Sequence, residues 1–184
     1  SLNNVFGRHG LEIFHIEPNR FHGGCMRYYL AHKGAYEASS DLLRQMAKEG
    51  DELGLDRPET YVRFRRNCES SRQRLMGLLD DIKCNGKRVV GYGATAKSCT
   101  VINYCGITSD HIEFISDTTP IKQGKLSPGA HIPVRPYEAF TSEPPDFALL
   151  FAWNHADEIL DKEQPFLADG GQFIRYVPRV EICP

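Results

Sequence analysis

The 184-residue sequence has few of the features that place a protein in a membrane or on nucleic acid. No run of apolar residues approaches the ~20 that a membrane-spanning helix needs. The first ten residues, SLNNVFGRHG, lack the apolar stretch of a signal peptide. The formal net charge is −2 and the pI is near 6.4, so no excess of basic residues indicates nucleic acid or an anionic membrane as partner. We therefore expect a soluble, cytoplasmic protein.

The six cysteines form no metal-binding pattern. They lie at positions 25, 68, 84, 99, 105 and 183, and none belongs to a C-x-x-C pair. The histidines show no matching spacing, so we expect no structural zinc site in this chain. Free thiols in a reducing compartment are the simpler interpretation.

Residues 1–35 predict a short helix followed by two strands. The helix closes at Gly10, LEIFHIEP alternates like a strand, HGG forms a turn, and CMRYYLAHKG is typical of a second strand. A two-stranded hairpin is marginally stable by itself in water, so these strands need a sheet to join. The segment is typical of a piece cut from a longer polypeptide.

Residues 36–85 are predicted to be helical. One helix covers SSDLLRQMAKEGDEL with Ser40 or Asp41 near its N-cap, and a longer helix begins near Asp56 and Pro58. An Asn-Gly pair ends the longer helix. Its apolar residues recur at steps of three and four and define one stripe: Tyr61, Phe64, Cys68, Leu75, Leu78 and Ile82.

Residues 86–184 alternate between strand and helix patterns. Strands are predicted at RVVGY, HIEFISD, HIPV, PDFALLFA and QFIRYV, with helices over 96–105, after Pro136 and over HADEILDKEQPFLADGG. This alternation predicts an α/β fold with a parallel sheet and flanking crossover helices. Such sheets bind ligands at the carboxyl ends of their strands, so three loops should face one crevice: Tyr92–Lys97, Asp117–Lys122 and Trp153–His155.

The stretch VVGYGATAKS at 89–98 carries the G-x-G-x-x-G/A pattern of a turn that holds a pyrophosphate at a helix N-terminus. Asp117 ends the next strand, where an acidic residue would bind the ribose of NAD. Nothing downstream supplies an evident second domain or proton-transfer pair for hydride transfer. From this pattern alone NAD, another nucleotide and a purely structural turn all stay open. S-adenosylmethionine fits less well, because two valines precede Gly91 where an acidic residue is usual.

Three long stretches carry a family resemblance: VVGYGATAKSCTVINYCGI, DTTPIKQGKLSPGAHIPVRP and PDFALLFAWNHADEI. They closely resemble the C-terminal domain of nucleotide-sugar C-methyltransferases, which build branched-chain deoxysugars, for example from dTDP-4-keto-deoxyhexoses. The resemblance extends back through HGGCMRYYLAHKG. It implies that residues 1–35 end a class I methyltransferase domain, that 36–85 form a helical connector, and that 86–184 form a Rossmann-like domain that binds the nucleotide-sugar.

The same resemblance implies that the remaining parts of such an enzyme precede Ser1. These parts are the zinc-binding cysteines, the S-adenosylmethionine turn and the Tyr-x-Glu-His catalytic stretch. We therefore assign no catalytic and no metal-binding residue to this chain. An NAD-dependent oxidoreductase fragment and a nucleotide-binding or interaction module without catalysis are the competing interpretations.

The resemblance implies a nucleotide-sugar ligand, dTDP-linked, whose sugar and base the sequence does not fix. N–H groups of Ala94–Lys97 would face its diphosphate and Lys97 would add charge, or be a solvated helix residue. Trp153 would wall the pocket or belong to the core, and Asn154 would contact the ligand or cap the next helix. His22 would approach the substrate or only shape its turn. The predicted substrate-binding residues are Tyr92, Gly93, Ala94, Thr95, Ala96, Lys97, Asp117, Thr118, Lys122, Trp153, Asn154 and His22.

Overall fold

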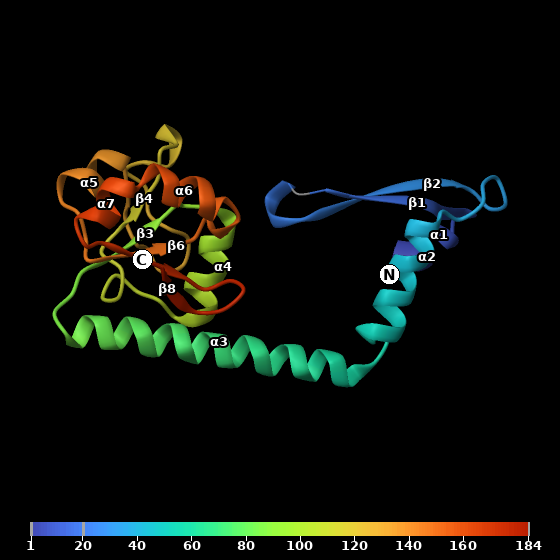
Figure 1. The fold of residues 1–184 in the computed structure, drawn as a ribbon, viewed down its shortest axis with the longest axis horizontal. Coiled ribbons are helices and arrows are strands. Elements are labelled where there is room, and N and C mark those ends of the chain that lie inside the picture. The colour runs from blue at the N-terminus through green and yellow to red at the C-terminus, as the bar shows by residue number, and fades with distance from the viewer. Residues whose placement is uncertain (1, 20, 184) are drawn as a thin grey trace. The chain divides into compact units, whose positions relative to one another are not determined.

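The computed structural model describes residues 2–19 and 21–183, except for the side chain of His22. The chain divides into two compact units, Ser1–Arg65 and Arg66–Pro184, and the boundary lies inside helix α3 (Pro58–Cys84). The predicted helical connector, 36–85, spans this boundary. Figure 1 shows the elements of both units, and each unit is described below by itself.

The first unit is built on the predicted hairpin. After helix α1 (Leu2–Gly7), strand β1 (Leu11–Asn19) pairs antiparallel with β2 (Cys25–His32), and the short helix η1 (Phe21–Gly23) joins them. Helix α2 (Ser40–Ala47) packs on this pair. The core it forms is small, and its buried members are Ile13, Ile16 and Leu42.

Helix α2 begins at Ser40, inside the predicted segment. Its N-cap is Ser39, whose hydroxyl oxygen accepts a hydrogen bond of 3.2 Å from the N–H of Leu42. The chain then widens into a π-helical turn, η2 (Lys48–Glu52), so the predicted single helix is two elements in the structure. Ser40, which was predicted near the N-cap, is the first helical residue; Ser39, Ser40 and Asp41 are all good caps, and only the backbone geometry selects among them.

The second unit contains a six-stranded sheet in the order β5-β4-β3-β6-β7-β8. All neighbouring pairs are parallel except β7 and β8, which are antiparallel. The predicted parallel sheet is therefore confirmed, and the edge strand β8 was missed because three residues carry no periodic pattern. The strands are β3 (Val89–Tyr92), β4 (Ile115–Ser116), β5 (Val134–Arg135), β6 (Phe147–Leu150), β7 (Gln172–Arg175) and β8 (Glu181–Cys183).

Helices cover both faces of this sheet, because successive strand residues point to opposite faces. Val89 belongs to the core under α4 (Ala96–Cys105) and the C-terminal half of α3. Val90 and Tyr92 belong to the opposite core, under α5 (Tyr137–Ser142), α6 (Ala156–Lys162) and α7 (Gln164–Ala168). The result is a three-layer α/β unit with helices on each side (Figure 1).

Helix α3 buries only the C-terminal part of its predicted apolar stripe. Leu75, Leu79 and Ile82 are at most 5% exposed, whereas Tyr61 and Phe64 are 57% and 65% exposed. The stripe prediction was therefore wrong for its first half, because the sheet lies only under the last three turns of the helix. It also omitted Leu79, which is fully buried. No helix in the described part of the chain is both long and apolar enough to cross a membrane.

Replacing Leu79 by alanine should lower the free energy of unfolding of the second unit by roughly 2–5 kcal/mol, because it leaves a cavity in the core. Phe64→Ala, in the exposed part of the same helix, should change it by less than about 0.5 kcal/mol. Urea unfolding followed by the fluorescence of Trp153, the single tryptophan of the chain, measures both changes. Equal losses in the two variants would contradict the division of α3 into a buried and an exposed part.

Candidate functional site

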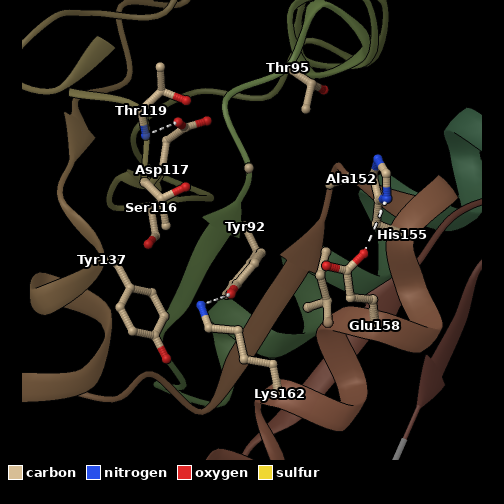
Figure 2. Close-up of a pocket in the computed structure, with 13 residues that line it drawn as sticks. Tyr92, Thr95, Ser116, Asp117, Thr119, Tyr137, Ala152, His155, Glu158 and Lys162 are labelled. Atoms are coloured by element: carbon tan, nitrogen blue, oxygen red, sulfur yellow. Dashed lines mark hydrogen bonds and ion pairs between the residues drawn. The ribbon is translucent and has the colours of Figure 1, made fainter. Parts of the chain in front are cut away.

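The carboxyl ends of β3, β4 and β6 open into a cavity of about 470 Å³, called here the first cavity. Its other walls come from the starts of α5 and α6 and from the last residue of α6 (Figure 2). Of the predicted binding residues, Tyr92, Gly93, Thr95, Asp117 and Thr118 line it. The rule that ligands bind at the carboxyl ends of parallel strands (the strand-end rule) therefore brings together residues from all three predicted loops, since His155 of the third loop lines the cavity as well.

Both glycines of the G-x-G pattern have a structural reason. At Gly91 a Cβ atom would lie 2.7 Å from the ring of Phe151, so this ring occupies the space that a side chain would need. Gly93 has φ +90°, which L side chains rarely adopt, and a Cβ atom there would lie 3.1 Å from that of Ala152. Gly91 thus makes room for the ring of Phe151 beside β3, and Gly93 lets the backbone turn from β3 toward α4 at the edge of the first cavity.

Asp117 ties the turn after β3 to the loop after β4. Its Oδ2 accepts hydrogen bonds from the N–H of Ala94 at 2.7 Å and from Nζ of Lys122 at 3.1 Å. Its Oδ1 accepts one from the N–H of Thr119 at 2.8 Å (Figure 2). The N–H of Ala94 thus faces Asp117. Contact of Asp117 with a ribose stays a prediction.

The electrostatics of Asp117 follow from these contacts. Burial by itself raises the pKa of this carboxyl, because it disfavours the charged form. The hydrogen bonds from Thr119 and Lys122 outweigh burial, and the pKa lies below its ordinary value. Asp117 is therefore ionised at neutral pH, although its residue is only 8% exposed.

Helix α4 begins at the same edge. Thr95 is its N-cap, and the side-chain oxygen accepts a hydrogen bond of 3.2 Å from the N–H of Ser98. Ala96 and Lys97 are in the first turn, where a helix leaves its N–H groups without helical acceptors and carries a partial positive charge. The side chain of Lys97 lies over the ring of Trp153, with Nζ 5.6 Å from the ring centroid.

A buried carboxylate, that of Glu163, forms the floor beneath the first cavity. Glu163 lies where α6 passes into α7 and is 3% exposed. Its Oε1 accepts a hydrogen bond of 2.6 Å from the hydroxyl of Tyr92, and its Oε2 accepts one of 3.0 Å from that of Tyr137. Nζ of Lys162 lies 3.3 Å from Oε1. We refer to Tyr92, Tyr137, Lys162 and Glu163 as the floor cluster.

The two tyrosines of the floor cluster are held in their neutral form. Burial and the hydrogen bond to Glu163 raise the pKa of Tyr92 well above its ordinary value. The same causes, in the same order, raise the pKa of Tyr137 to about 12. Both hydroxyls keep their protons at neutral pH and donate them to Glu163, so neither is a base for a substrate.

Sequence reasoning found only Tyr92 in the floor cluster. Tyr137 follows Pro136 directly after β5, so the strand-end rule applied to that strand would have found it. For Lys162 and Glu163 no local signal exists, because both read as polar residues of one continuous helix. The structure breaks that helix at Glu163, two residues before Pro165.

Other predicted residues lie beside the first cavity. Trp153 and Asn154, in the short helix η4 (Trp153–His155), line an adjoining second cavity of about 530 Å³, which shares His155 and Glu158 with the first. Oδ1 of Asn154 is buried and has no hydrogen-bond partner among the described residues. The cap alternative for Asn154 was wrong, because His155 takes the N-cap position of α6.

Ala94 and Lys122, the last residue of η3 (Pro120–Lys122), line a third cavity of about 320 Å³. Ala96 and Lys97 line none of these three described cavities. His22 lies in η1, and its side chain is outside the described residues. Across residues 2–19 and 21–183 there is no group of three or more His, Cys, Asp or Glu side chains that could hold a metal ion.

Asp117→Asn keeps the size of the side chain but removes its charge. At pH 7 it should lower the free energy of unfolding by roughly 1–3 kcal/mol, because the three hydrogen bonds to the carboxylate weaken. The depressed folded-state pKa means that this stabilisation is present above the unfolded value of about 3.9 and is lost as the pH falls through the folded value. Urea unfolding should therefore show a smaller difference in the free energy of unfolding between Asp117→Asn and wild type at pH 3 than at pH 7.

Asp110→Asn is the matched control, because this carboxylate is 77% exposed and pairs with Lys83 only at 3.7 Å. It should change stability little at either pH. A penalty for Asp117→Asn that is the same at both pH values would contradict the assigned role of its charge.

Two comparisons with known proteins agree with this architecture. Residues 20–178 match the family model of the C-methyltransferase C-terminal domain. The chain is also 35% identical over 182 residues to C-methyltransferase NovU of Streptomyces niveus, an alignment that covers 99% of this chain and 43% of NovU. The chain thus spans less than half the length of this curated relative.

Proposed function

The chain belongs to the family of C-methyltransferase C-terminal domains, and from this premise we propose that it is the part of an S-adenosylmethionine-dependent C-methyltransferase that binds a nucleotide-linked keto-deoxysugar. The observation that carries the proposal is the turn from Gly91 to Ala96, which leads from a parallel strand into a helix N-terminus beside the first cavity. Rossmann-like units bind nucleotides at this edge.

The shape of the site supports a ligand with two bulky ends. The first and second cavities adjoin, and each is large enough for a nucleoside or a sugar. A nucleotide-sugar has such ends and a diphosphate between them. We place the nucleoside in the first cavity, beside Thr118 and Tyr137, the diphosphate at the first turn of α4, and the sugar toward Trp153 and Asn154. Within this scheme Lys97 and Lys122 remain proposed contacts.

The methyl donor does not fit the turn described above. Val89 and Val90 precede the turn, and the carboxylate of Asp117 already accepts three hydrogen bonds from its own loops. We therefore propose that the S-adenosylmethionine site, the catalytic base and any zinc site lie in the part of the longer relatives that this chain does not span. The contribution proposed for this chain is to hold the nucleotide in register, and such positioning lowers reaction barriers.

The hairpin of β1 and β2 suits a complementary role. Two strands with both edges unpaired within the described residues are marginally stable by themselves. We propose that residues 1–35 complete the sheet of a class I methyltransferase domain, through which substrate and methyl donor are brought together.

The chain should bind a dTDP-sugar weakly and at least tenfold more tightly than NAD or S-adenosylmethionine. Binding is weak because a ligand held between two domains loses contacts when one is removed, while the association entropy still opposes binding. Isothermal titration with the three ligands under identical conditions measures this. Preferential binding of NAD would restore an oxidoreductase interpretation, and tight binding of S-adenosylmethionine would contradict the placement of its site.

Ala96→Pro tests the diphosphate position without removing a side-chain contact. Ala96 is the first residue of α4, where proline is tolerated, and it follows Thr95 in an extended conformation. The change removes one N–H, so the affinity for dTDP should fall about tenfold, the loss expected for a hydrogen bond to a charged group. Binding of thymidine should be unchanged. Ala96→Ser, which keeps the N–H, is the control, and equal dTDP affinities in the two variants would exclude a contact with this amide.

A further inference from the structure

Lys162 carries the positive charge at the floor of the first cavity. Among the described residues that line this cavity it is the only lysine or arginine. Its side chain is 47% exposed, yet its ammonium group is held from three sides. Nζ lies 3.3 Å from the hydroxyl oxygen of Tyr92, 3.3 Å from Oε1 of Glu163 and 3.7 Å from the ring centroid of Tyr137.

This arrangement leaves an N–H donor of Lys162 for a ligand. An ammonium group has three N–H donors and no acceptor; one donates to the hydroxyl oxygen of Tyr92, and Glu163 is the ion-pair partner of the ammonium group. The tyrosine hydroxyls of the floor cluster donate their hydrogen bonds to Glu163. The floor therefore offers the ligand a donor from Lys162, and only a group with a hydrogen-bond acceptor satisfies it.

The buried carboxylate decides which acceptor fits. Glu163 already compensates the charge of Lys162, and its side chain is 4% exposed. A phosphate at Lys162 would also lie near this desolvated carboxylate and be repelled by it. A neutral carbonyl oxygen accepts the same hydrogen bond without that repulsion.

The position of Lys162 in the cavity also favours a neutral carbonyl oxygen over a phosphate as its ligand. Figure 2 shows Lys162 and Thr95, the N-cap of α4, at opposite ends of the site. Tyr137 lines the cavity at the end occupied by Lys162 and supplies an aromatic wall. With the diphosphate at α4, the other end of a nucleotide, its planar base, reaches the floor cluster.

We propose that Lys162 determines the base specificity of the site by donating a hydrogen bond to the C4 carbonyl oxygen of a pyrimidine base, favouring a diketo pyrimidine over one that carries an amino group at C4. This inference rests on the proposed function, since it requires a nucleotide in the first cavity. Glu163, Tyr92 and Tyr137 act as positioning residues that hold the ammonium group in place.

The test compares dTDP, dCDP and inorganic pyrophosphate as probes, by calorimetry, on the wild-type chain and two variants. Wild type should bind dTDP at least tenfold more tightly than dCDP. Lys162→Met should remove most of this preference by weakening dTDP binding, with pyrophosphate binding unchanged. Lys87→Met is the matched control: Lys87 is similarly exposed and is paired with Asp146 at 2.8 Å, but lies at the amino edge of the sheet. It should keep the preference.

Each other result has a distinct meaning. Lys162→Met with unchanged binding of dTDP, or a wild type without preference between the two nucleotides, would overturn the base assignment while leaving the proposed function intact. Loss of pyrophosphate binding in Lys162→Met, with the thermal unfolding midpoint retained, would also overturn it and make Lys162 a phosphate ligand. A wild-type chain that binds neither dTDP nor pyrophosphate would overturn the proposed function itself, and this inference with it.

Discussion

The hydrogen bonds that converge on the buried carboxylate of Glu163 connect the parts of the second unit that surround the first cavity. Tyr92 comes from the end of β3, Tyr137 from the start of α5, and Glu163 from the junction of α6 and α7. Burying a charge is costly unless it is hydrogen-bonded. Two tyrosine hydroxyls and Lys162 meet that cost, and in doing so they fix the end of β3 against the helices of one face.

Asp117 is a second buried carboxylate that connects parts of the second unit around the first cavity. Its carboxylate joins the turn after β3 to the loop after β4 through hydrogen bonds from Ala94 and Thr119. Thr95, the N-cap of α4, and Lys162 both line the first cavity. The site is thus assembled from two carboxylates that serve the architecture and from groups they leave free for a ligand.

The parts of this architecture that the sequence predicts are those with local causes. Helix α4 ends at Gly106 with φ +78° and α3 ends before Gly86 with φ +67°, because glycine adopts this conformation without strain. The strand-end rule predicted that Asp117 lies at the crevice, and Asp117 follows β4 and lines the first cavity. Glu163 was missed because its burial depends on partners 71 and 26 residues away in the chain. The same holds for Leu79, since only the position of the sheet decides which turns of α3 are buried.

The central claim is that the carboxyl edge of the sheet binds a nucleotide across the turn after β3. Chemical-shift mapping of the ¹⁵N-labelled chain with dTDP at millimolar concentration measures this directly. The account predicts shifts at the amides of Gly93, Ala96, Thr118 and His155, and none at Val89, Phe147 and Gln172, where the strands begin. Shifts confined to that amino edge, or unchanged amides at Gly93 and Ala96, would contradict it.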